Sequence, residues 1–289
     1  MNTAIENFTP RHEFLVCIDS DGCAFDTMEI KHKECFCPAT IEDWELQPVS
    51  KYAREAWEYV NLYSKTRGCS RFHAIIYMLD LLAERKEVKA RNFRMPEYES
   101  LRHWVKTAPV LNNDALGKLT DDPVMERTFQ WSLDVNRRIA KMVHGVPPFP
   151  YVRESLERLS EFADIVIVSA TPREALLKEW HEHGLDRYIA LLGAQEDGSK
   201  KEIISKVKGF YESEKSIMLG DAPGDYNAAS ANGILFYPII PNDEENSWKE
   251  FHDRIIDLFK RGIYGGEEMK KQIERFDKAL PDTPPWISG

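Results

Sequence analysis

At 289 residues, the chain is long enough to bury a substantial core, as one large domain or as two ordinary ones. Its net charge of -10 argues against a nucleic acid or an anionic membrane surface as the main partner. No apolar run approaches the ~18–20 residues of a membrane span, and no basic stretch followed by an apolar one opens the sequence, so we expect a cytoplasmic protein.

The five cysteines are odd in number and irregularly spaced. No Cys-x-x-Cys pair is matched by a second such pair or by two histidines, which argues against a structural zinc site. Cys35 and Cys37 could together hold a metal or react, but reduced thiols without a chemical role are the favoured interpretation.

The first expected element is a buried strand that begins at Phe14 and ends in two acids, Asp19 and Asp21. From residue 29 to residue 147, strand-like alternation is nearly absent and helix start and stop signals are frequent. This block is therefore expected to be entirely helical. Its clearest helices are expected over residues 49–66, 71–88 and 123 to about 144.

After residue 148 the pattern changes to short apolar runs that alternate with amphipathic helices. The runs are too short for helices and rich in Ile, Leu and Val, which is typical of strands buried on both faces. We expect strands over 164–170, 188–195, 216–222 and 234–240, and helices over 150–162, 172–183, 199–209, 224–231, 246–261 and 266–279. The proline-rich segment from Leu280 onward is expected to be loosely held.

The two sequence patterns, helical from residue 29 to residue 147 and alternating after it, predict a discontinuous α/β domain that an all-helical domain interrupts. Alternating strands and helices favour a Rossmann-like parallel sheet with helices on both faces. The expected α/β domain comprises residues 1–28 and 148–289, and the inserted helical domain comprises residues 29–147.

Polar residues follow three of the expected strands. Asp19 and Asp21 follow the first strand, Ser169 follows the second, and Asp221 and Asp225 belong to the Gly-Asp-Ala-Pro-Gly-Asp sequence after a third. Ligands of parallel α/β sheets bind beyond the carboxyl ends of the strands. If these strands are neighbours, four carboxylates and a hydroxyl converge on one crevice.

Four like charges in a partly desolvated crevice are unfavourable unless cations compensate them. A hard divalent cation with oxygen ligands is the simplest compensation, and Mg²⁺ in particular keeps waters and shares phosphate oxygens of a substrate. Lys200 or Lys201, at the start of an expected helix, supplies a further positive charge.

Together these residues resemble the four motifs of the haloacid dehalogenase superfamily. The motifs are Asp19-Ser20-Asp21-Gly22 after a strand, Ser169 after another strand, a lysine before a helix, and Gly220-Asp221 with Asp225 four residues later. Each motif alone is weak, but all four stand in the family's order and strand context. The resemblance covers residues 1–28 and 148–289, and the helical block resembles a cap inserted after the first motif, although it is larger than many such caps.

The resemblance implies a role for each acid of the first motif. Asp19 would be the nucleophile that attacks phosphorus and forms an aspartyl-phosphate. Asp21 would protonate the leaving alkoxide and then deprotonate the water that hydrolyses the intermediate. Alternate residues of an extended chain point the same way, so both side chains can reach one site.

The remaining roles also come from the resemblance. Ser169 and the amide of Ala170 would hydrogen-bond the phosphoryl group, and Lys200, preferred over Lys201 from the helix-start pattern, would tie Asp19 to the phosphate. Mg²⁺ would be bound by Asp19, by the carbonyl of Asp21, by Asp221 and by Asp225, the last directly or through water.

An aspartate at the second acid position favours phosphomonoester hydrolysis or phosphoryl mutase chemistry over dehalogenation. The sequence therefore predicts a Mg²⁺-dependent phosphatase acting on a small phosphorylated molecule such as phosphoglycolate, a sugar phosphate or a nucleotide. Two alternatives stay open. One is a phosphomutase of the β-phosphoglucomutase kind, and the other is a non-catalytic binding or regulatory protein with the same fold.

Overall fold

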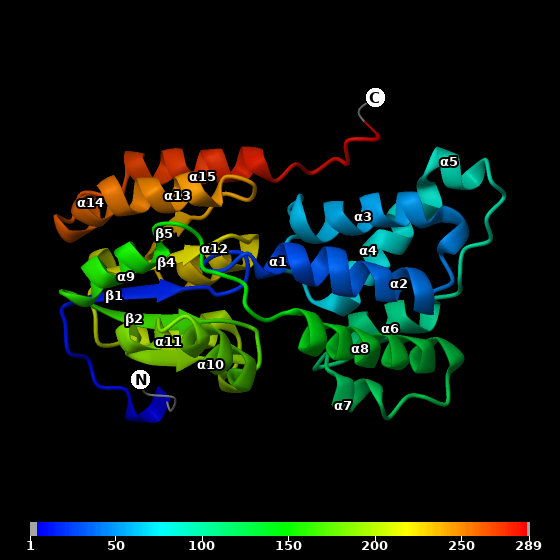
Figure 1. The fold of residues 1–289 in the computed structure, drawn as a ribbon, viewed down its shortest axis with the longest axis horizontal. Helices are drawn as coiled ribbons and strands as arrows, with labels where there is room; N and C mark the ends of the chain where they lie inside the picture. Colours follow the sequence, from blue (N-terminus) through cyan, green and yellow to red (C-terminus); the bar gives the residue numbers. More distant parts are fainter. Residues whose placement is uncertain (1–4, 288–289) are drawn as a thin grey trace. The chain divides into compact units, whose positions relative to one another are not determined.

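The computed structural model describes residues 5–287, so the first four and last two positions of the expected α/β domain lie outside the described residues. The chain divides into two compact units, both drawn in Figure 1. One unit takes the chain up to Thr27 and from Gly145 to Leu280. The other takes the chain from Met28 to His144 together with the C-terminal segment that begins at Pro281.

The first unit is built on a parallel sheet with five strands in the described chain, in the order β3-β2-β1-β4-β5. The predicted α/β class is therefore confirmed. Ile18 of the central strand pairs with Ile167 on one side and with Leu219 on the other, which aligns the carboxyl ends of three strands. The strands are β1 (Phe14–Ile18), β2 (Ala163–Val168), β3 (Leu191–Gly193), β4 (Ser216–Gly220) and β5 (Leu235–Pro238).

Both faces of this sheet are apolar and covered by helices. In β1, Val16 and Ile18 belong to the core on one face, and Leu15 and Cys17 belong to the core on the other. Because helices cover both faces of the sheet, side chains on both sides of each strand are buried, and the strand sequences are continuous apolar runs. The first core takes side chains from α9 (Val152–Ser160), α10 (Arg173–Glu182), α13 (Glu244–Glu250) and α14 (Ile256–Lys260), and the second from α11 (Lys200–Lys208), α12 (Pro223–Ala231) and α15 (Glu267–Ala279).

Two predicted elements of this unit differ in the structure. The expected strand 188–195 shrinks to three residues because a 3-10 turn, Asp186–Tyr188, occupies its start. The expected helix 246–261 is interrupted by a π-helical stretch, Phe251–Ile255, between α13 and α14. The apolar pattern marks both segments as buried but does not distinguish these local backbone forms.

Every regular element found between residues 28 and 144 is helical. The long helix α8 starts as its sequence predicts: Pro123 is its first residue, and the Asp122 carboxylate accepts hydrogen bonds from the amides of Val124 and Met125. The helices are α1 (Thr27–Ile30), α2 (Cys37–Asp43), α3 (Ser50–Leu62), α4 (Arg71–Glu84), α5 (Lys86–Lys89), α6 (Glu99–Thr107), α7 (Asn113–Leu116) and α8 (Pro123–Met142), with a π-helical stretch at Lys31–Phe36.

Aromatic side chains fill the core of the helical unit. Trp57 and Trp131 are fully buried and meet edge to face, with ring centroids 6.2 Å apart. The indole N–H of Trp131 donates to the Thr40 hydroxyl at 3.0 Å, so this polar group is satisfied inside the core. In residues 5–287, no helix is both long enough and apolar enough to cross a bilayer.

The C-terminal segment packs against the helical unit, so the expectation of a loosely held tail is wrong. The Tyr59 hydroxyl donates a hydrogen bond to the Pro281 carbonyl at 3.1 Å. Trp286 meets Tyr59 edge to face at 5.6 Å, and the Arg85 guanidinium lies 4.4 Å from the centre of the Trp286 ring. The Trp286 side chain therefore holds the C-terminal segment against the helical unit, although the proline content of this segment predicted that it would not pack.

We expect Trp286→Ala to destabilise the helical unit by about 1–2 kcal/mol, because it removes one aromatic and one cation–π contact. Amide hydrogen exchange should become faster in α3 and at the start of α5 and stay unchanged in the sheet. Ile287→Ala is the matched control, since Ile287 is 59% exposed in the same turn. Equal exchange in both variants would show that the tail contributes no stability.

Candidate active site

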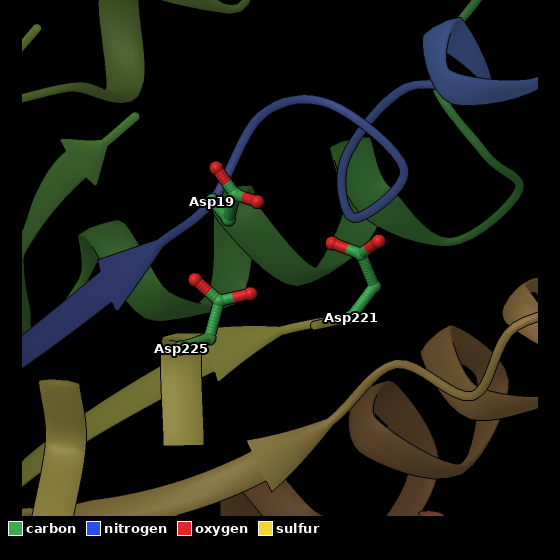
Figure 2. Close-up of side chains that lie close together, drawn as sticks. All are labelled: Asp19, Asp221 and Asp225. Atoms are coloured by element: carbon green, nitrogen blue, oxygen red, sulfur yellow. The ribbon is translucent and has the colours of Figure 1, made fainter. Parts of the chain in front are cut away.

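Three buried carboxylates meet at the carboxyl edge of the sheet (Figure 2). Asp19 follows β1, Asp221 follows β4, and Asp225 lies in the first turn of α12. Their nearest oxygens lie within 4.8 Å of one another. The three residues are 5%, 1% and 0% exposed, so water screens their charges poorly.

The Gly-Asp-Ala-Pro-Gly-Asp turn brings two of these acids close through its own backbone. A side chain at Gly220 would collide with Asp225, so the turn needs glycine there. The Asp225 carboxylate accepts a hydrogen bond from the Ala222 amide at 3.1 Å and thereby caps α12, whose first residue is Pro223. Asp225 is thus both a helix cap and a member of the acidic group.

Lys200 is the cation of this group. Its ammonium nitrogen lies 2.8 Å from Asp19 Oδ2 and 2.6 Å from Asp225 Oδ1. The preceding residue, Ser199, caps α11 reciprocally with Glu202, which sets the direction in which the first residue of the helix leaves the backbone. Lys201, the alternative considered from the sequence, is exposed.

Within this group the three carboxylates outnumber the ammonium of Lys200, which contacts Asp19 and Asp225. Burial raises the pKa of Asp19 well above its usual range, Asp225 and Asp221 raise it further, and Lys200 only partly opposes them. Burial by itself would lower the pKa of Lys200, but Asp19 and Asp225 outweigh that effect and raise it. A divalent cation fits this donor set, since clustered buried oxygens with excess negative charge are what such ions require.

Asp21 is held separately from the group of three. One of its oxygens accepts the Thr27 hydroxyl and the other accepts the Thr171 hydroxyl at 2.7 Å. Gly22 follows with φ of +75°, a left-handed conformation that turns the chain away directly after the acid. Two hydroxyl donors from different parts of the chain therefore orient the second acid.

Ser169 directly follows β2 and is connected to Asp21 through Thr171. Its amide donates to the Gly193 carbonyl at 3.1 Å, and its hydroxyl accepts from the Thr171 amide at 3.2 Å. Ser169 is buried and the following residue, Ala170, is exposed. Thr171 thus connects the second strand end to the first, since it hydrogen-bonds both Ser169 and Asp21.

The structure brings together four of the residues selected from the sequence, Asp19, Lys200, Asp221 and Asp225, and puts Asp21 and Ser169 beside a shared threonine. Sequence reasoning missed the two threonines. Thr171 stands two residues after Ser169, which is a weak indication of a role in the site. Nothing in the sequence around Thr27 indicates such a role. The five cysteines are free thiols, and burial together with the nearby acids raises the pKa of Cys23, which keeps it neutral.

No family model and no curated protein matches the sequence, whereas solved structures do. A candidate phosphoglycolate phosphatase from Lactobacillus delbrueckii subsp. bulgaricus is 14% identical, with 89% of this chain and 100% of that chain covered and a TM-score of 0.51. A candidate haloacid dehalogenase-like hydrolase from Bacteroides fragilis is also 14% identical, with 82% and 93% covered and a TM-score of 0.51. The chain therefore has the haloacid dehalogenase-like fold, and the resemblance seen in the motifs is confirmed at that level.

Asp19→Asn is expected to raise the Tm of the metal-free protein at neutral pH, because it removes one charge from a group with excess negative charge. Since burial and the neighbouring acids raise the pKa of Asp19, ionisation of this carboxyl destabilises the native state. Wild type and variant should be similar well below pH ~4, the value near which an aspartate of the unfolded chain titrates, because this carboxyl is then protonated in both the folded and unfolded chain. The variant should become the more stable as the pH rises above that value.

Calorimetry in the presence of a chelator across this pH range measures the difference. Addition of Mg²⁺ should raise the Tm of wild type more than that of the variant. A variant that is less stable than wild type at neutral pH would contradict the excess of negative charge.

Proposed function

We propose that the protein is a Mg²⁺-dependent phosphatase that hydrolyses a small phosphomonoester through an aspartyl-phosphate. The observation that carries the proposal is the buried Asp19, bonded to Lys200 within a group of three carboxylates, at the carboxyl edge of a haloacid dehalogenase-like sheet. We further propose the helical unit as the cap of this fold, and we keep the cytoplasm as the expected compartment.

In the first step, an Asp19 oxygen would attack phosphorus while the bond from phosphorus to the leaving alkoxide breaks. Asp21 would give its proton to that alkoxide. Carboxylates are modest nucleophiles, so the phosphoryl charge must be neutralised: Lys200 supplies one positive charge, and Mg²⁺ held by Asp19, Asp221, Asp225 and the Asp21 carbonyl would supply the rest.

In the second step, Asp21 would take a proton from water, whose oxygen attacks phosphorus and frees Asp19 and inorganic phosphate. The Thr27 and Thr171 hydroxyls support this role because they donate to both oxygens of Asp21 and so fix its orientation. The Ser169 hydroxyl and the Ala170 amide would hydrogen-bond the phosphoryl group throughout.

We expect phosphate release from at least one member of a panel of phosphoglycolate, sugar phosphates and nucleoside monophosphates, with Mg²⁺ and not with a chelator. Asp19→Asn should lower kcat by a factor on the order of 10³ or more, because no nucleophile replaces the carboxylate. Asp257→Asn is the control, since this aspartate is 60% exposed on α14. A wild type without Mg²⁺-dependent release from any member would favour a binding protein.

Phosphorus NMR of the sugar phosphate incubations separates hydrolysis from mutase chemistry. Hydrolysis is expected to convert the ester signal into that of inorganic phosphate. Conversion into an isomeric ester without net phosphate release would assign the same Asp19 and Asp21 chemistry to a phosphomutase.

A further inference from the structure

Ser20, the residue between the two acids of the first motif, is fully buried and uses every polar group that it has. Its amide donates to Asp19 Oδ1 at 2.8 Å. Its carbonyl accepts from the amides of Ala24 and Phe25 at 3.0 and 3.1 Å. The backbone of Ser20 is therefore held at its amide by the Asp19 side chain and at its carbonyl by two backbone amides.

The Ser20 hydroxyl is held by two consecutive residues of α10, far away in the sequence. It donates to Glu179 Oε2 at 2.7 Å and accepts from the indole N–H of Trp180 at 2.9 Å. Trp180 is fully buried and meets Phe25 edge to face at 5.3 Å. The donor of this pair is thus fixed by packing, and the half-buried carboxylate of Glu179 completes the arrangement.

These contacts orient both acids through the residue between them. Ser20 lies in the turn that follows β1, between the two acids. A serine that is held by its amide, carbonyl and hydroxyl fixes the backbone from which both Asp19 and Asp21 leave. The segment that leads into α10 also holds Asp21 directly through Thr171. One stretch of chain after β2 therefore fixes the spacing of Asp19 and Asp21.

We propose that Glu179 and Trp180 are positioning residues for the reaction proposed above, which they serve by fixing Ser20 and hence the geometry of Asp19 and Asp21. Glu179 serves as the hydrogen-bond acceptor of the Ser20 hydroxyl, at 2.7 Å.

The test compares kcat and KM of Glu179→Ala, Glu179→Gln, Trp180→Phe and Ser20→Ala with those of wild type. Glu179→Ala and Ser20→Ala are each expected to lower kcat by about 10- to 100-fold with little change in KM, because a small misplacement of reacting groups is costly. Glu179→Gln should stay within about threefold of wild type, since its amide oxygen can still accept the serine hydroxyl. Trp180→Phe keeps the ring packing and loses the N–H, so an intermediate loss is expected.

Two further variants isolate the route of the effect. Ser20→Ala combined with Glu179→Ala should be no slower than Ser20→Ala alone, because both changes remove the same hydrogen bond. Glu174→Ala, on the exposed side of the same helix, should leave kcat unchanged. The proposal is overturned if Glu179→Ala behaves like Glu174→Ala, if Glu179→Gln is as slow as Glu179→Ala, or if the two single losses multiply in the double variant.

Amide hydrogen exchange keeps this proposal separate from the proposed function. The Ala24 and Phe25 amides should exchange faster in Glu179→Ala and at the wild-type rate in Glu179→Gln, whether or not the protein hydrolyses phosphomonoesters. If the wild type shows no turnover but the variants still show this exchange pattern, the proposed phosphatase activity is wrong and the proposal that Glu179 fixes Ser20 holds. Equal exchange rates of these amides in wild type and all variants would contradict the proposal that Glu179 fixes Ser20.

Discussion

The site depends on the cluster of three buried carboxylates, two of which contact the Lys200 ammonium. Buried charges are costly unless they are paired, and Lys200 neutralises only one of the three acids. A fold selected for stability alone would not keep this excess of negative charge in its interior. The apolar cores on the two faces of the sheet supply the stability that lets the edge hold it.

The order of the strands explains why residues 200 positions apart meet. The central strand β1 has β4 on one side and β2 on the other, and all three run in the same direction with aligned ends. Asp19, Asp221 and Ser169 therefore lie at one edge as a consequence of the sheet and need no long side chain to reach it. Lys200 and Asp225 come from the first turns of α11 and α12, and a reciprocal cap at Ser199 fixes the start of α11.

Much of this arrangement was predictable because strands and motif residues carry periodic or spaced signals. The five strands and the group around Asp19 follow from apolar runs that end in polar residues. The contacts that a single side chain makes through tertiary packing were not predictable. Such single contacts join residues that are 6 to more than 150 positions apart, with no repeat or spacing to reveal them. They are the hydrogen bonds of Thr27 and Thr171 to Asp21, those of Glu179 and Trp180 with Ser20, and the contact of Trp286 with Arg85.

The same contacts make the first motif a rigid loop. The Asp19 amide donates to the Leu219 carbonyl, Ser20 is anchored on α10, and the Cys23 carbonyl accepts the indole N–H of Trp248 at 2.7 Å from α13. Gly22 and Phe25 close the loop on themselves. The loop is thus fixed to β4, α10 and α13 up to Thr27, where the chain leaves the first compact unit until Gly145. Asp19 and Asp21 therefore lie on a segment whose backbone and side chains are held from three other elements of the same unit.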